Sequence, residues 1–408
     1  MSFALLTEQE KPSSSEHPFD AHVVLLNSYI PPHALPVYVE LSRRVRKFTV
    51  LLSTPMESHR HWKPDWGTLD VRLQRTLTIE RPWKHRAGFR DKLNVHIPWN
   101  TLGLLRKLRP DVVLSAELGP RSLFSALYTM FTGTPLVLVA TLSEHQELGR
   151  GWARYWLRRW LIRRARCIAV NGHSGARYLR RLGADPNRLF HVPYSAVPNY
   201  FDHLPLVRPS SQSHKLFYVG QLVERKGLVP FVEALARWAV KHPERTVEFE
   251  IAGSGPLEPV LRSLRLPENI QLRLLGERTF DELTGCYAKA GILVFPTLSD
   301  EWGLVVNEAL AAGLPVLGST YSQAVEELCI EGETGWRFRT TVAGEMDDAI
   351  DRALSTSADT LDTMRRAGHE LVKKLTPAYA AEGFLTTIKA ALGGTECMKP
   401  DHAAMGNV

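Results

Sequence analysis

Cysteine is scarce in this chain of 408 residues, and long apolar runs are absent. The four cysteines lie far apart and form no CxxC pair, which argues against a zinc site or a dense disulfide framework and fits a reducing compartment. No stretch approaches the roughly 20 apolar residues that a membrane-spanning helix needs. Residues 1–20 lack the apolar core of a signal peptide and include a run of serines, which predicts a disordered lead-in. These features predict a soluble or peripheral protein of the cytoplasm.

Positive charge is in modest excess, with a net charge of +7, and it is concentrated in one segment. Residues 150–181 contain ten arginines and no acidic residue, which points to an anionic partner. Within Gly151–Arg166, aromatic residues alternate with arginines at near-helical spacing. This segment is either an amphipathic helix lying on the anionic inner face of the cytoplasmic membrane, or a helix that packs its aromatics on a sheet and leaves its arginines in water. Nucleic acid is not an expected partner, because no recognition fold accompanies the charge.

Short apolar runs alternate with helical patterns through the first half of the chain. The predicted strands are 21–28, 48–53, 110–115, 135–140 and 167–171, and the predicted helices are 33–46, 121–131 and 174–182. Apolar runs bounded by turn residues are typical of strands buried in a parallel sheet. Residues 21–207 are therefore predicted to form one Rossmann-like domain.

A polar segment, 208–214, is predicted to link this domain to a second strand–helix series. The second series has predicted strands at 215–220, 248–252, 270–275, 292–296 and 315–319, and predicted helices at 228–241, 255–263, 279–288 and 304–312. Repeated units of this kind imply a doubly wound parallel sheet. The chain is thus predicted to be an α/β protein whose two Rossmann-like domains, 21–207 and 215–375, face each other across a ligand-binding cleft. A final helix is predicted at 376–392 and a loose tail at 393–408.

The sequence FPTLSDEWGLVVNEALAAGLPVLGS, residues 295–319, carries the strongest chemical signal. A predicted strand ends at Pro296, an acidic loop follows, and a helix begins near Gly303. The backbone N–H groups of Gly303, Leu304 and Val305 would then point into the cleft. A helix N-terminus of this kind is an anion site suited to a phosphate.

Three acidic residues belong to the same stretch. Glu308 lies about a turn and a half inside the predicted helix, where a carboxylate can accept two hydrogen bonds from a vicinal diol such as that of a ribose. Asp300 and Glu301 precede the helix and could hold sugar hydroxyls. The alternative is that Asp300 and Glu301 are solvated acids that stabilise the helix dipole.

A second motif, FYVGQLVERKG at residues 217–227, runs from a predicted strand through Gly220 into a short loop and then a helix. Glycine lets the backbone approach a ligand closely, and the cations Arg225 and Lys226 could neutralise a diphosphate. The alternative is an ordinary strand–helix turn with exposed cations.

A third motif, IAGSGPL at residues 251–257, repeats this arrangement with Gly253 and Gly255 at a strand end. Alone it is a common pattern. The three motifs together are specific, because they occur in order at the strand ends of one predicted sheet.

In these motifs the sequence resembles the C-terminal half of the family 4 glycosyltransferases, which have the GT-B fold. The resemblance covers residues 215–338 well and the N-terminal domain more loosely. Aligned on the family's Gly-Leu pair, Asp300 takes the first acidic position of the E-x7-E stretch and Glu308 the second. Lys226 matches the family's phosphate-binding lysine.

Three positions depart from the family pattern, the first being Asp300, an aspartate in the first glutamate position of E-x7-E. Gln221 stands where the family usually has arginine, and Arg225 is the nearby cation that could take its place in the diphosphate clamp. Trp302 replaces the family's phenylalanine.

The resemblance implies a retaining glycosyltransferase that uses a nucleoside-diphosphate sugar and requires no metal or other cofactor. Preorganised cations and helix N–H groups would stabilise the leaving diphosphate, as a metal ion otherwise would. The acceptor, expected to be a glycan or lipid-linked molecule of polysaccharide or lipopolysaccharide biosynthesis, would bind the N-terminal domain. The family often has a functional histidine after the strand that ends at Ala140, which makes Glu144 and His145 candidates.

Two other functions fit parts of the pattern. A non-catalytic, nucleotide-sugar-binding scaffold of a membrane-associated assembly would fit the departures at Gln221 and Asp300, whereas the presence of Lys226 and Glu308 argues against it. A sugar-nucleotide epimerase would also have Rossmann-like architecture, but it leaves the aromatic, arginine-rich segment unexplained. Release of nucleoside diphosphate in the presence of an acceptor distinguishes a transferase from a scaffold.

Overall fold

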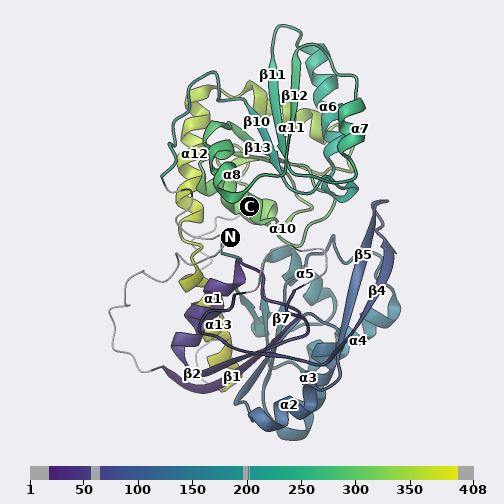
Figure 1. Ribbon diagram of the computed structural model, residues 1–408, viewed down its shortest axis with the longest axis vertical. Coiled ribbons are helices and arrows are strands. Elements are labelled where there is room, and N and C mark those ends of the chain that lie inside the picture. Colours follow the sequence, from purple (N-terminus) through teal and green to yellow (C-terminus); the bar gives the residue numbers. More distant parts are fainter. Residues whose placement is uncertain (1–17, 57–64, 196–200, 202, 394–408) are drawn as a thin grey trace.

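The computed structural model describes residues 18–56, 65–195, 201 and 203–393, which form two α/β domains stacked one on the other (Figure 1). Each domain is built on one parallel sheet, which confirms the predicted fold class. The predicted lead-in lies outside the described residues up to position 17, and the predicted tail lies outside them from position 394. Within the described ranges, no helix combines the length and apolar character that crossing a bilayer requires.

The N-terminal sheet has seven strands in the order β3-β2-β1-β6-β7-β8-β9. Its strands are β1 (Phe19–Asn27), β2 (Val45–Leu52), β3 (Asp70–Leu73), β6 (Val112–Ala116), β7 (Leu136–Ala140), β8 (Cys167–Val170) and β9 (Leu189–His191). Its helices are α1 (Ala34–Arg44), α2 (Thr101–Leu108), α3 (Pro120–Thr132), α4 (Trp152–Arg164) and α5 (His173–Arg181). Strand β2 begins at Val45, whereas the sequence predicted a helix over residues 33–46. The predicted helix therefore extends two residues beyond the end of α1.

Alternation along β1 shows how this sheet is buried on both faces. Val23 and Leu25 join the core on the side of α1, while Val24 and Leu26 join the core on the opposite side. Successive side chains of a strand point to opposite faces, so a strand covered on both sides is apolar throughout. This explains the unbroken apolar runs of the sequence.

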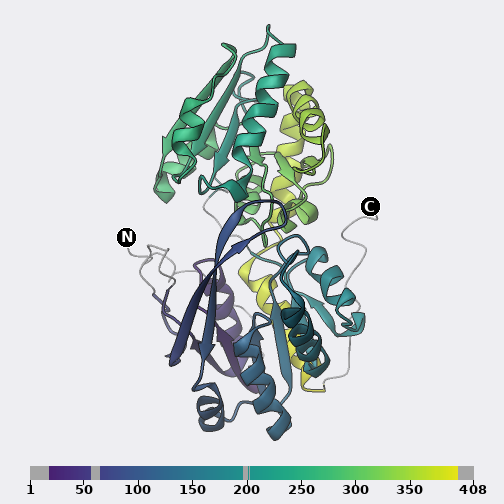
Figure 2. The same ribbon diagram turned by 90° about the vertical axis from the view of Figure 1, so that its right-hand side faces the viewer.

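A two-stranded antiparallel hairpin rises from the lower domain toward the upper one (Figures 1 and 2). It consists of β4 (Thr76–Lys84) and β5 (Arg90–Pro98). The sequence patterns predict no element between residues 54 and 109, so this hairpin, together with β3 and α2, is new information from the structure.

The C-terminal sheet has six parallel strands in the order β12-β11-β10-β13-β14-β15. Its strands are β10 (Leu216–Val219), β11 (Val247–Ala252), β12 (Ile270–Gly276), β13 (Ile292–Phe295), β14 (Val316–Ser319) and β15 (Gly335–Phe338). The helices are α6 (Leu228–Lys241), α7 (Glu258–Ser263), α8 (Phe280–Lys289), α9 (Leu304–Ala311), α10 (Gln323–Leu328), α11 (Glu345–Ser355) and α12 (Ala358–Val372). The strand order reverses between β10 and β13, and in the other sheet between β1 and β6, which is where ligands bind in doubly wound folds.

The last helix, α13 (Pro377–Ala391), lies in the lower domain although it follows the upper one in the chain (Figure 1). Its residues Ala381, Phe384 and Ile388 belong to the same hydrophobic core as β1 and α1. The polar segment 208–214 is packed on the upper domain, where the guanidinium of Arg208 donates to the carbonyl of Ala312 at 3.0 Å. The two domains are therefore connected by the chain twice.

Candidate active site

A cavity of about 1790 Å³ lies between the two domains. Residues that follow the carboxyl ends of the central strands line it: Ser28 after β1, Glu117 after β6, Gln221 after β10 and Asp300 after β13. These are the strands beside the reversal point of each sheet. The cavity thus lies where the topology of both sheets places a ligand site.

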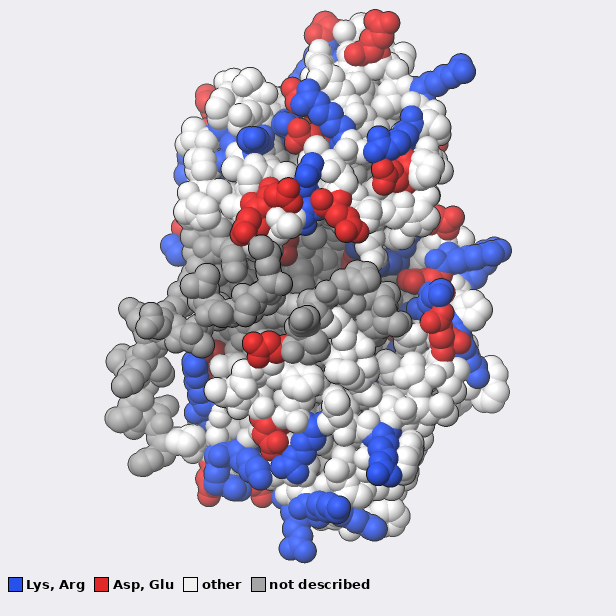
Figure 3. All heavy atoms as spheres, viewed as in Figure 1, with Lys and Arg blue, Asp and Glu red and all other residues white. Residues whose placement is uncertain are grey.

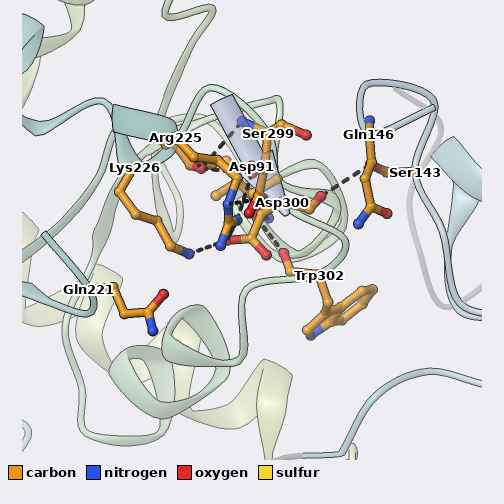
Figure 4. Close-up of polar contacts among 12 residues, drawn as sticks. Asp91, Ser143, Gln146, Gln221, Arg225, Lys226, Ser299, Asp300 and Trp302 are labelled. Carbon is orange, nitrogen blue, oxygen red and sulfur yellow. Dashed lines mark hydrogen bonds and ion pairs between the residues drawn. The ribbon is translucent and has the colours of Figure 1, made fainter. Parts of the chain in front are cut away.

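Two cations and one carboxylate form a compact cluster on the upper wall (Figure 4). Lys226 Nζ contacts Asp300 Oδ2, and Arg225 Nη1 lies 3.5 Å from the same oxygen. Arg225 also donates to the carbonyl of Ser299 at 3.0 Å. Burial alone would raise the pKa of Asp300, but the charges of Lys226 and Arg225 lower it. Asp300 therefore stays ionised and holds both cations beside the cavity.

Glu308 lines the cavity one helical turn beyond the start of α9. The hydroxyl of Tyr287, a fully buried residue of α8, donates to Glu308 Oε2 at 3.0 Å. Burial raises the pKa of Glu308, while this hydrogen bond opposes the change. Tyr287 fixes one carboxylate oxygen, and Glu308 retains accepting capacity for a ligand.

The predicted helix N-terminus is also at the cavity. Gly303, Leu304 and Val305 all line it. Gly303 has φ 105°, and a Cβ there would lie 2.8 Å from the ring of Phe295, so glycine is required by both the backbone and the space. The first N–H groups of α9 have no carbonyl within the helix to bind, which leaves them for a ligand.

Glu301 lines the cavity but turns toward the lower domain. Tyr194, which follows β9, donates its hydroxyl to Glu301 Oε1 at 3.0 Å and stacks on Trp302 with ring centroids 5.5 Å apart. Burial, with the nearby charge of Asp300, raises the pKa of Glu301 to about 7. Glu301 is therefore a contact between the domains as well as a cavity residue.

The three predicted strand-end glycines do not line the cavity. A Cβ on Gly253 would lie 1.9 Å from the carbonyl oxygen of Gly220, and a Cβ on Gly255 would lie 2.5 Å from that of Leu222. Leu222 N in turn donates to the carbonyl of Ser254 at 2.8 Å. These glycines let the loop after β10 and the loop after β11 pack closely against each other. Gln221, which lies in the first of these loops, lines the cavity.

Glu144 and His145 also lie away from the cavity lining. Glu144 forms ion pairs with Arg177 and Arg181, and the ring of His145 packs at 4.5 Å from that of Tyr321. The residues of the same loop that line the cavity are Thr141, Gln146 and Arg150. Between them, Ser143 donates to the carbonyl of Asp300 at 3.1 Å, which joins the loop to the upper domain (Figure 4).

The hairpin contributes cavity residues that carried no sequence motif. Trp83, Phe89 and Asp91 line the cavity. Asp91 Oδ2 lies 3.6 Å from Arg225 Nε, so the hairpin reaches across to the cation cluster of the upper domain (Figure 4). Tyr194 and Tyr287 were likewise outside every motif, because a tyrosine hydroxyl that binds a distant carboxylate leaves no local pattern.

Helix α4 combines features of both interpretations of the arginine-rich segment. Trp152 is 78% exposed and Trp156 is 58% exposed, so these aromatics do not pack on the sheet as one interpretation required. Arg158 is instead buried, together with Leu161 and Ile162. On the face of the molecule shown in Figure 3, basic and acidic side chains both occur on each of the two domains.

Comparisons with known protein families agree with the two-domain arrangement. Residues 213–356 match the family described as "Glycosyl transferases group 1", and residues 19–195 match a "Glycosyl transferase 4-like domain". The D-inositol 3-phosphate glycosyltransferase of Corynebacterium glutamicum (strain R) is 30% identical over 162 residues, which is 38% of this chain and 38% of that protein. The phosphatidylinositol N-acetylglucosaminyltransferase gpi3 subunit of Schizosaccharomyces pombe is 29% identical over 195 residues, which is 47% of this chain and 41% of that protein. The chain therefore spans less than half the length of these curated relatives.

Solved structures match over almost the whole chain. Anabaena HepE in complex with UDP-glucose superimposes with a TM-score of 0.64 at 13% identity, covering 91% of this chain and 100% of that one. The lipopolysaccharide outer core galactosyltransferase WaaB has a TM-score of 0.64 at 12% identity, covering 90% and 99%. At these identities the match shows a shared fold.

Proposed function

Since this chain belongs to the group 1 glycosyltransferases, the GT4-like family with the GT-B fold, we propose that it transfers a sugar from a nucleoside-diphosphate sugar to an acceptor held by the lower domain. The observation that carries the proposal is one wall of the cavity, where Lys226, Arg225, the N-terminus of α9 and Glu308 lie together. Cations, free N–H groups and a carboxylate are the groups that a diphosphate joined to a ribose requires.

Each group has a distinct role in the proposed reaction. Lys226 and Arg225 neutralise the leaving diphosphate, together with the first N–H groups of α9, so that no metal ion is needed. Glu308 accepts hydrogen bonds from the ribose, and Asp300 lies where the sugar would follow the diphosphate. As in the family that the sequence resembles, the configuration at the anomeric carbon would be retained. HepE was solved with UDP and UDP-glucose, so a uridine nucleotide is the first donor to test.

Replacing Lys226 with alanine is expected to weaken UDP binding at least about tenfold, because one charge-assisted contact to phosphate is lost. Isothermal calorimetry measures the affinity. Lys289→Ala, which removes an exposed lysine outside the cavity, is the control. Release of UDP from UDP-sugars in the presence of acceptor tests catalysis. An unchanged affinity in the Lys226 variant would refute the donor assignment, and binding without any release would favour the non-catalytic scaffold.

For the acceptor, we propose a glycan or lipid-linked molecule used to build a cell-surface polysaccharide. The two curated relatives are named for a phosphorylated inositol and for phosphatidylinositol, and WaaB for the lipopolysaccharide outer core. The lower domain offers the acceptor the loops after β1, β6 and β7, all of which reach the cavity.

We also propose that α4 places the enzyme on an anionic membrane surface. Exposed Trp152 and Trp156 share the helix with the exposed cations Arg163 and Arg164. Tryptophan favours the interface of a bilayer, and basic side chains are attracted to anionic head groups. Such a position would bring a lipid-linked acceptor to the cleft from the membrane.

The double variant Arg163→Gln/Arg164→Gln is expected to bind anionic vesicles about 30-fold more weakly, since each cation near such a surface contributes about 1 kcal/mol. Flotation with phosphatidylcholine vesicles, with and without phosphatidylglycerol, measures the binding. Arg106→Gln/Lys107→Gln removes two adjacent exposed cations from α2 and is the matched control. Equal flotation of the two double variants would leave α4 with a purely structural role. Arg158 is unsuitable for this test, because it is buried in an ion pair.

A further inference from the structure

Arg150 lies at the hairpin end of the cavity, and it forms no ion pair with any residue that the structure describes. It lines the cavity, and its guanidinium lies 3.8 Å from the centre of the Trp83 ring. Its Nε donates to the carbonyl of Gln146 at 3.1 Å, and its Nη1 is buried with no hydrogen-bond partner among the residues that the structure describes. Burial is unfavourable for a cation that lacks a counter-ion, and here it lowers the pKa of Arg150 to about 10.

The surroundings of Arg150 add further positive charge. Arg154 and Arg158 follow at intervals of four residues, and both contact the same carboxylate, that of Glu147, at 3.5 and 2.5 Å. Burial opposes ionisation of Glu147, but the charge of Arg158 keeps its pKa lowered. Arg154 and Arg158 thus share one carboxylate, and among the described residues Arg150 forms no ion pair with it.

A second carboxylate, that of Asp91 on the hairpin, also lines the cavity. The charge of Asp91 acts to raise the pKa of Arg150. The cation that Asp91 contacts, however, is Arg225 of the upper domain, at 3.6 Å. Among the described residues Arg150 therefore has no ion-pair partner of its own. It belongs to the lower domain, whereas Lys226 and Asp300 belong to the upper domain.

We propose that Arg150 binds a phosphate group carried by the acceptor. This inference rests on the proposed function, because it assigns the donor diphosphate to the opposite wall. A phosphate monoester carries nearly two negative charges, and it would supply both a counter-ion for Arg150 and an acceptor for its buried Nη1. The planar guanidinium is suited to bidentate contacts with phosphate, and stacking on Trp83 fixes its plane before the ligand arrives.

The site can be tested without knowing the whole acceptor. The protein is labelled with 5-fluorotryptophan, the Trp83 resonance is assigned with Trp83→Phe, and methyl phosphate is titrated in the presence of saturating UDP. We expect a saturable shift of the Trp83 resonance. Arg150→Met should raise the dissociation constant at least about tenfold, and Arg150→Lys should raise it less, because it keeps the charge but loses the bidentate contact.

Matched controls identify what is recognised. Arg86→Met removes an exposed arginine of the same hairpin and should leave the titration unchanged. Trimethyl phosphate, which is uncharged, should give no shift. Dimethyl phosphate is the diester analogue: tighter binding of dimethyl phosphate would indicate a phosphodiester within a lipid-linked acceptor, and tighter binding of methyl phosphate a terminal phosphate.

A shift that is equal in wild type and Arg150→Met, or no shift with either charged ester, would overturn the inference. Failure of the proposed function is recognised separately, as absence of UDP binding. In that case the titration is repeated without UDP on Lys226→Ala protein. A shift that still depends on Arg150 would then preserve this site and remove only the donor assignment.

Discussion

The Glu308→Ala variant is expected to bind nucleoside diphosphate about a hundredfold more weakly than wild type, because two hydrogen bonds to a charged acceptor are lost. Turnover with a sugar donor should fall as well, since the ribose no longer orients the anomeric carbon. The fold should persist, because Glu308 lines the cavity and is only partly buried. Calorimetry with UDP measures the affinity, and thermal unfolding checks the fold.

Two further variants separate the parts of this prediction. Tyr287→Phe removes the hydroxyl that positions Glu308 and should cost about 1 kcal/mol of binding, roughly fivefold, because the carboxylate itself remains. Asp300→Ala should reduce turnover but not UDP affinity, since it releases Lys226 for the diphosphate. A folded Glu308→Ala protein that binds UDP as wild type does would exclude the ribose role.

The largest loss of stability is expected for Glu147→Ala, about 3–5 kcal/mol in the free energy of unfolding. Glu147 is 3% exposed and its partner Arg158 is 2% exposed, so the substitution leaves a buried guanidinium without its counter-ion. Among the described residues, Arg158 would keep its hydrogen bond to the hydroxyl of Tyr178, at 2.7 Å. Urea unfolding monitored by circular dichroism measures the change.

Controls show whether burial of the charge causes this loss. Glu370→Ala removes a carboxylate that is 68% exposed and paired with Lys373, and it should change stability by less than about 1 kcal/mol. The double variant Glu147→Leu/Arg158→Met replaces the buried pair with apolar side chains and should recover much of the loss. Equal effects of Glu147→Ala and Glu370→Ala would contradict this account of the cluster.

The sequence predicted elements well where burial shaped the pattern. Strands covered on both faces are continuous apolar runs, and β7 and β13 were located within a residue or two of their observed ends. The hairpin was missed for the opposite reason. Strand β4 is largely exposed and β5 is exposed at its start, and both contain charges and a proline, so no apolar period marks them.

The site was predictable to the extent that its chemistry is local. Glu308 and Lys226 belong to short motifs at strand ends, and both lie at the cavity. Contacts made by distant segments gave no such signal, as the pairing of Arg225 with Asp91 shows. The sequence also showed the helical spacing of α4, but it did not show which side of the helix faces inward. The reason is that Arg158 is buried by its ion pair with Glu147, and Glu147 lies outside the helix.

Helix α13 has a consequence for biosynthesis. A ribosome delivers the chain in order, and the complete upper domain emerges before Ala381, Phe384 and Ile388, which fill the core beside α1. The lower domain must wait for these side chains with its apolar face uncovered. The upper domain is therefore free to fold first, against the usual order in which the N-terminal unit forms earliest. Because Ala380 and Phe384 of this helix also line the cavity, completion of the cleft would coincide with its docking.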